Sequence, residues 1–115
     1  MTIPSDFIKF IELNTSMETS LCHDDALYII FEPIQGLEKL NRALEVEKYV
    51  PGFYAFATDG GNELYAFDQN GSVFMLPMIG LSAEHAIKIT DNWNEFENLI
   101  KISANLQHPS ANNNE

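Results

Sequence analysis

The sequence has few cysteines, few basic residues and no long apolar run. Its single cysteine, Cys22, excludes an internal disulfide framework and is typical of a reducing compartment. No apolar stretch reaches the roughly 18 to 20 residues that cross a bilayer. The first residues, MTIPSDFIKF, lack the basic and apolar segments of a signal peptide. These absences predict a cytoplasmic protein that does not enter a membrane.

Basic residues are scarce relative to acidic ones. Six Lys and Arg oppose seventeen Asp and Glu, which gives a net charge of −11 spread along the chain. Such a field repels nucleic acid and anionic membranes and speeds encounters with basic partners. Acidic surfaces also keep many proteins soluble. Charge therefore leaves two interpretations open, a solubilising surface and a surface shaped for a cationic protein.

The residues that are present are those of a globular domain. Of the 115 residues, 45% are hydrophobic, with 8 Phe, 4 Tyr and 1 Trp. A chain of this size can bury most of its apolar surface in one core. We expect a single domain over residues 1–106 and a disordered polar tail over 107–115.

Helical periodicity occurs in three stretches of the chain. Apolar residues recur at helical spacing over 3–14, over 36–47 and from Trp93 onward. Asn92, with Glu95 three residues later, forms a capping-box signature at the start of the last stretch. Residues 82–85 are compatible with one helical turn, whereas the polar stretch 15–25 has no period and predicts a loop.

Strand patterns fill most of the remaining chain. The run 26–31 is continuously apolar, and three strand-length runs follow at 53–58, 63–68 and 72–76. The turns between these three runs are so short that their neighbours must be antiparallel, and Asn70-Gly71 favours a type I′ turn. The pattern predicts an α+β fold whose antiparallel sheet contains a three-strand meander, flanked by short N-terminal, central and C-terminal helices. Because the aromatic residues do not alternate with polar ones, both faces of the meander must be at least partly covered.

Several segments carry a family resemblance in their order along the chain. They are a proline-containing first helix, a strand followed by a helix with an asparagine, a Pro-Gly pair before a strand, a Gly-rich turn and a final helix that opens on a small–aromatic–x–x–Phe pattern. In this sequence they are Ile3-Pro4-Ser5-Asp6-Phe7, Ile30-Phe31-Glu32-Pro33 through Asn41, Pro51-Gly52, Asp59-Gly60-Gly61 and Asn92-Trp93-Asn94-Glu95-Phe96. Together they resemble the SUKH superfamily, which includes yeast cell-wall synthesis regulators and many bacterial immunity proteins. The resemblance extends from about Ile3 to Ile102.

The resemblance implies a non-enzymatic binding domain without a cofactor. Immunity proteins of this kind bind a cognate toxin, often a nuclease, and the charge of −11 suits a basic toxin. We expect no direct contact with nucleic acid or membrane, and either a monomer or a weak homodimer. The alternatives within this resemblance are a regulator, a scaffold, or a module that binds a small molecule or glycan.

The predicted binding surface lies on the meander, where acidic and aromatic residues mix. Tyrosine is enriched where an interface needs apolar area and a polar tip. Carboxylates beside the tyrosines would attract a basic partner. The predicted partner-binding residues are Tyr54, Asp59, Glu63, Tyr65 and Asp68.

Catalytic and metal sites have weaker support in the sequence. Cys22-His23-Asp24-Asp25 places possible ligands side by side, but adjacent residues rarely converge on one ion, and no zinc spacing accompanies them. A phosphate site at Asp59 lacks a cation, because no Lys or Arg occurs between Lys48 and Lys88. The segment from Asp68 begins like a calcium loop but lacks its closing glutamate. We therefore expect no catalytic residue and no metal ligand.

Overall fold

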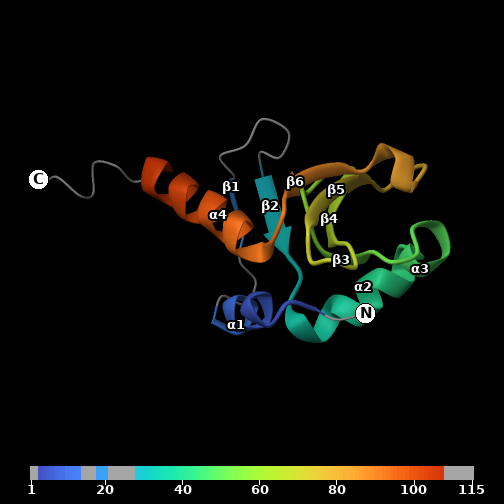
Figure 1. Cartoon of the computed structure of the whole chain (residues 1–115), viewed down its shortest axis with the longest axis horizontal. Helices are drawn as coiled ribbons and strands as arrows, with labels where there is room; N and C mark the ends of the chain where they lie inside the picture. Colours follow the sequence, from blue (N-terminus) through green and yellow to red (C-terminus); the bar gives the residue numbers. More distant parts are fainter. Residues whose placement is uncertain (1–2, 14–17, 21–27, 108–115) are drawn as a thin grey trace, which may run out of the picture.

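The computed structural model describes residues 3–13, 18–20 and 28–107. Within them, an antiparallel sheet of six strands runs in the order β1-β2-β3-β4-β5-β6, with helices around it (Figure 1). This confirms the α+β prediction, although the sheet is larger than a three-strand meander. The strands are β1 (Glu18–Ser20), β2 (Tyr28–Phe31), β3 (Tyr54–Thr58), β4 (Glu63–Phe67), β5 (Val73–Pro77) and β6 (Ile87–Thr90).

The two edge strands were not predicted. β1 lies inside the stretch 15–25 that was expected to be a loop, and it pairs with β2. β6 pairs with β5 after the helical turn expected near 82–85, which is confirmed as η2 (Ala83–His85). Because every strand pairs with its neighbour in sequence, the meander continues through the whole sheet.

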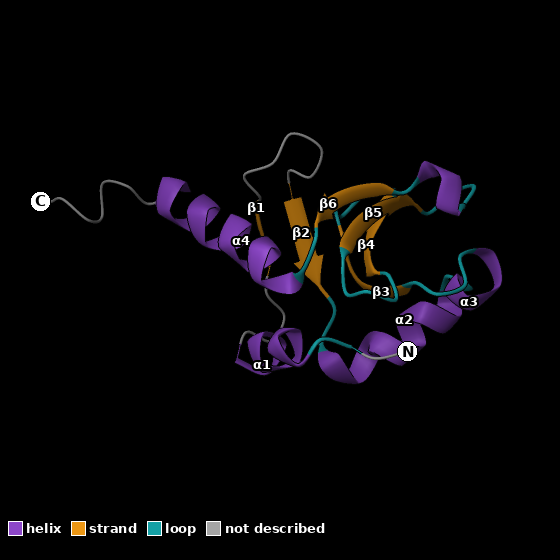
Figure 2. Ribbon diagram, in the orientation of Figure 1, coloured by secondary structure: helices purple, strands orange, loops and turns teal. Residues whose placement is uncertain are grey.

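The helices surround the strands, as Figure 2 shows. They are α1 (Ser5–Leu13), α2 (Leu37–Ala43), α3 (Val46–Tyr49) and α4 (Trp93–Gln107), and the short turn η1 (Ile34–Gly36) precedes α2. The continuous helix predicted over 36–47 is wrong, because Glu45 adopts a left-handed conformation with φ 54° and ψ 44°. A residue in this region cannot continue a right-handed helix, so the chain restarts as α3.

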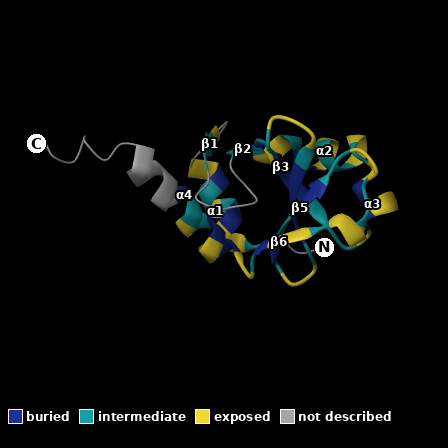
Figure 3. Cartoon of the chain, turned by 90° about the horizontal axis from the view of Figure 1, so that it is seen from above, coloured by how far each residue is buried: buried dark blue, intermediate teal, exposed yellow. Residues whose placement is uncertain are grey.

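Both faces of the sheet are covered, as the sequence predicted. Along β4, Tyr65 and Phe67 face a first cluster of buried residues, and Leu64 and Ala66 face a second cluster on the other side of the sheet. The first cluster lies against α1 and α4 and includes Phe7, Ile11, Phe56, Phe67, Trp93, Phe96 and Ile100. The second lies against α2, α3 and the β5–β6 connection, and its fully buried members are Val46, Val50, Ala55, Leu64, Ala66 and Leu76. Figure 3 shows the buried residues along the strands and the exposed ones mainly on turns and outer helix faces.

The N-terminus of α4 is capped by the side chain that the sequence indicated. The Glu95 backbone N–H donates to Asn92 Oδ1 at 2.9 Å. The Glu95 carboxylate accepts from the backbone N–H of Asp91 at 3.0 Å, one residue earlier than in the usual capping box. α4 continues through Gln107, the first residue of the predicted tail, and residues 108–115 lie outside the described part of the chain.

Candidate functional site

Two of the predicted site residues, Asp59 and Asp68, perform the same structural task in successive hairpin turns. Asp59 Oδ1 accepts hydrogen bonds from the backbone N–H groups of Gly61 and Glu63, at 2.8 and 3.1 Å. Asp68 Oδ1 accepts equivalent bonds from Asn70 and Ser72, both at 2.9 Å. Each carboxylate therefore holds a turn by bonding the backbone two and four residues further on.

The conformation of the second turn differs from the one expected. A type I′ turn requires positive φ at both central residues. Among the described non-glycine residues, Glu45 alone has a positive φ, so Asn70 does not meet this requirement. Gly71 has a φ of 82°, and its N–H donates to the carbonyl of Asp68 at 3.1 Å. The prediction of a hairpin is confirmed, but the prediction of a type I′ turn is wrong.

The structure divides the predicted surface into two groups. Asp59 and Glu63 lie at the end of β4 where the β3–β4 turn enters. Asp68 follows the other end of β4, where Tyr54 is the register partner of Phe67. Strands rise about 3.4 Å per residue, so the ends of five-residue β4 are ~13 Å or more apart. The five residues therefore do not form one compact patch.

Tyr65 contributes no surface in this structure. Its side chain is 0% exposed and belongs to the first core cluster. Its hydroxyl donates to the backbone carbonyl of Tyr28 at 2.6 Å, which satisfies the polar tip inside the core. Burial, followed by the charges of Asp59 and Glu63, raises the pKa of Tyr65 well above its ordinary value. Tyr65 is thus a core residue, and a direct contact with a partner would need Tyr65 to leave the core.

The group at the β3–β4 turn retains an acidic surface. Partial burial, followed by the charge of Asp59, raises the pKa of Glu63. Within the described part of the chain, Glu38–Arg42, Glu45–Lys48 and Lys88–Asp91 form ion pairs, whereas neither Asp59 nor Glu63 takes part in one. The pKa of Lys88 is raised mainly by Asp91 and also by Asp68, so the other end of β4 has a cation nearby. The turn at Asp59 is therefore the less compensated end.

The described residues contain neither a metal-ligand cluster nor a membrane-spanning helix. No group of at least three His, Cys, Asp or Glu side chains within residues 3–13, 18–20 and 28–107 could hold a metal ion. The candidate ligands from Cys22 to Asp25 lie outside these ranges. None of the helices in these ranges has the length and apolar character required to cross a bilayer.

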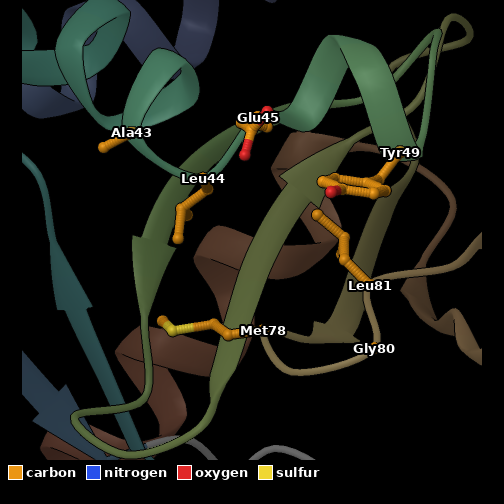
Figure 4. A pocket seen from close by; sticks show the side chains of 7 residues that line it. All are labelled: Ala43, Leu44, Glu45, Tyr49, Met78, Gly80 and Leu81. Carbon is orange, nitrogen blue, oxygen red and sulfur yellow. The ribbon is translucent and has the colours of Figure 1, made fainter.

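Two cavities beside α3 were not predicted from the sequence. One has a volume of about 390 Å³, and its lining includes Leu44, Tyr49, Met78 and Leu81 (Figure 4). The other, of about 360 Å³, is lined in part by Val46, Phe53 and Tyr54. Glu45, the residue with left-handed backbone, lines both. A sequence signal existed in Met78-Ile79-Gly80-Leu81, an apolar run that belongs to no strand or helix.

Comparison with known proteins adds no assignment. No protein-family model matches the chain, and no curated protein matches it. The resemblance to the SUKH superfamily stays a prediction that rests on the segments quoted above.

Proposed function

We propose that the chain is a non-enzymatic, cytoplasmic protein-binding domain that neutralises a cognate basic toxin, with a nuclease as the expected class. The observation that carries this proposal is the acidic turn at the β3–β4 connection, where Asp59 and Glu63 have no ion-pair partner among the described residues. The SUKH-like order of segments supports the same function. A nuclease that binds a polyanion presents basic side chains, and an acidic domain can cover them.

Electrostatic complementarity would act mainly on the rate of association. A domain of charge −11 attracts a cationic partner over distances comparable to the screening length of the solution. Complementary potentials raise the rate of encounter and disfavour acidic competitors. The acidic turn adds a local contact to this general attraction.

The first test is co-expression with the toxic domain encoded beside the gene for this chain. Rescue of growth supports the proposal, and continued toxicity despite soluble expression of both proteins contradicts it. A gene neighbourhood without a toxin would favour the alternative.

The second test compares two variants with the same net charge. Glu63→Lys reverses a charge at the acidic turn, and Glu12→Lys makes the same reversal at an exposed position of α1. At low salt, we expect Glu63→Lys to slow association with the toxin identified by the first test by several-fold more than Glu12→Lys does. High salt should reduce the difference. Equal effects of the two variants would show that the turn makes no specific contact.

The alternative function is a SUKH-type regulator, a scaffold or a small-ligand module. The cavities beside α3, of about 390 and 360 Å³, fall within the usual range of roughly 300 to 1,000 Å³ for ligand sites. Stabilisation of the folded chain by a small molecule or glycan, together with no rescue from a neighbouring toxin, would favour this alternative.

A further inference from the structure

The second cavity beside α3 is lined mainly by apolar surface. It has a volume of about 360 Å³, and Val46, Phe53 and Tyr54 contribute apolar side chains to it. The cavity of Figure 4 differs, because it exposes more polar than apolar surface. A mainly apolar cavity of roughly 300 to 1,000 Å³ is the usual form of a small-molecule site. The second cavity is therefore the stronger candidate for a ligand.

The cavity lies where β3 begins, beside α2 and α3 (Figure 1). The β2–β3 register ends at Ala57, so the first residues of β3 lack a β2 partner on that side. The left-handed Glu45 separates α2 from α3, so two short helices contribute to the lining in place of one long helix. The cavity thus results from the early departure of β2 and from the break between the helices.

Contacts within the protein hold the walls of the cavity in place. The Phe53 ring packs edge-to-face on Phe74, with centroids 5.3 Å apart and an interplanar angle of 82°. Tyr54 packs against the first core cluster. The Asn41 amide, which also lines the cavity, forms three hydrogen bonds to backbone groups. Walls that are fixed before binding lose little conformational freedom when a ligand enters.

The charges around the cavity favour a neutral ligand. Glu38 pairs with Arg42 at 3.7 Å. Glu45 pairs with Lys48 at 3.6 Å, so these four lining charges compensate one another. Of the lining residues, which all belong to the described part of the chain, Glu47 alone carries a charge without an ion pair, and it is exposed to screening by water. An anion would meet Glu47 and the net charge of −11, whereas a neutral ligand avoids this repulsion.

The Tyr54 hydroxyl is an available hydrogen-bond donor. Within the described part of the chain, no group is hydrogen-bonded to it. Burial, followed by the charge of Glu38, raises the pKa of Tyr54, so the hydroxyl keeps its proton at neutral pH. A ligand that brings an acceptor would give this hydroxyl a partner.

We propose that this cavity binds a neutral aromatic small molecule, with its ring against Phe53 and Tyr54 and a hydrogen-bond acceptor at the Tyr54 hydroxyl. Aromatic rings gain from edge-to-face and offset contacts with one another, so a flat ring suits these two side chains better than an aliphatic group of similar size. The cavity lies at the opposite end of β3 from the acidic turn, because Tyr54 begins this strand and Asp59 follows it. The inference therefore goes beyond the proposed function and holds whether or not the chain binds a toxin.

The test uses methyl naphthyl ketone as the probe and the full chain as the receptor. The ketone is neutral, has fused aromatic rings and carries an acceptor. From the usual binding free energy per non-hydrogen atom, we expect a Kd of about 1 mM or below in an amide NMR titration. The shifts should concentrate at Val46, Phe53 and Tyr54. Naphthoate, which has the same rings and a negative charge, should bind at least about tenfold more weakly.

Two substitutions separate the hydroxyl from the rings. Tyr54→Phe should weaken binding of the ketone about fivefold, the effect of one neutral hydrogen bond, and should not affect isopropenylnaphthalene, which has the same shape but no acceptor. Phe53→Leu removes a ring but keeps apolar volume, so it should weaken binding of the ketone about threefold and leave the saturated analogue acetyldecalin unaffected. Tyr49→Phe is the matched control without effect, because Tyr49 lines the cavity of Figure 4 and not this one.

Each part of the inference has a result that would overturn it. The absence of a saturable shift with the ketone, or shifts confined to Leu44, Met78 and Leu81, would overturn the choice of cavity. Equal binding of naphthoate would overturn the choice of a neutral ligand. If Tyr54→Phe weakens binding of the ketone and of isopropenylnaphthalene equally, the hydroxyl is not the donor. If Phe53→Leu weakens binding of the ketone and of acetyldecalin equally, the aromatic preference is wrong.

Discussion

Asn41 on α2 gives the sharpest prediction about the fold. Its side chain accepts from the backbone N–H of Ala55 at 2.7 Å and donates to the Ala55 carbonyl at 2.8 Å. The same amide donates to the Leu37 carbonyl at 2.9 Å. The β2–β3 register ends with Phe31 opposite Ala57, so Ala55 pairs with Ala66 of β4 but lies beyond the part of β3 that pairs with β2. The Asn41 amide thus replaces the missing strand neighbour at Ala55.

The cost of removing this amide follows from what it leaves behind. In Asn41→Ala, the N–H and C=O of Ala55 lose their partner, and Ala55 is 0% exposed. An unsatisfied buried polar group costs about 1–3 kcal/mol, and alanine regains a few tenths in helix propensity. We therefore expect a loss of about 2–4 kcal/mol, reduced if water reaches the site. A loss of this size is a large share of the ~5–15 kcal/mol that stabilises a typical domain.

Urea denaturation measures this loss directly. The fluorescence of Trp93, which is 2% exposed, should report unfolding of the first core cluster. Lys39→Ala, at an exposed position of the same helix, is the control and should change stability by less than about 0.5 kcal/mol. Asn41→Asp should also destabilise, because a carboxylate cannot donate to the carbonyl groups. If Asn41→Ala loses less than about 1 kcal/mol with an unchanged m value, the amide does not replace a strand neighbour in the way described.

Three further groups of substitutions test the core, the turns and the helix break. Tyr65→Phe should lose about 1 kcal/mol at neutral pH, because it removes the bond to Tyr28. Folding raises the pKa of Tyr65, so the stability that its neutral hydroxyl contributes is fully present below about pH 10 and is lost as the pH rises further. The free energy of unfolding of Tyr65→Phe should therefore fall less steeply in alkali than that of the unchanged protein, and an identical alkaline slope in both proteins would contradict this. Asp59→Ala and Asp68→Ala should each lose about 1 kcal/mol, whereas the Asn variants, which keep an acceptor, should lose less in the same urea titration. Equal losses for Ala and Asn would argue against the turn role. Glu45→Gly should gain about 0.5–1 kcal/mol by relieving the left-handed conformation, and a loss in thermal unfolding would show that the side chain outweighs the strain.

The central strands could be predicted because their residue pattern reflects a physical requirement. Leu64, Tyr65, Ala66 and Phe67 are all apolar, as expected for a strand with a core on each face. The edge strand β1 lacked such a pattern. Glu18-Thr19-Ser20 in β1 is polar, and β1 is a strand because β2 provides its hydrogen-bond partners. Such tertiary effects override local preference and are not visible in a single segment.

Neither the helix break nor the binding surface could be predicted from the sequence, and the reasons differ. Glu45 is neither Gly nor Pro, so no local sequence signal indicates that its backbone is left-handed. Val46 and Val50, which follow Glu45, pack into the second core cluster. The sequence predicted turns at Asp59 and Asp68 from their residue types. It did not predict that β4 would separate these turns. Because both faces of the sheet are apolar, it also could not decide that Tyr65 would be buried.

The two-sided core limits how a partner can approach. Helices and connections cover both faces of the central strands, so a partner must contact turns, edge strands or the outer helix surfaces. Asp59 is suited to such a contact because the turn already fixes its carboxylate through Oδ1. A group that is ordered before binding loses little conformational freedom on association. Asp68 is fixed in the same way, but its charge is partly compensated by Lys88, so the turn at Asp59 offers the stronger attraction to a cationic protein.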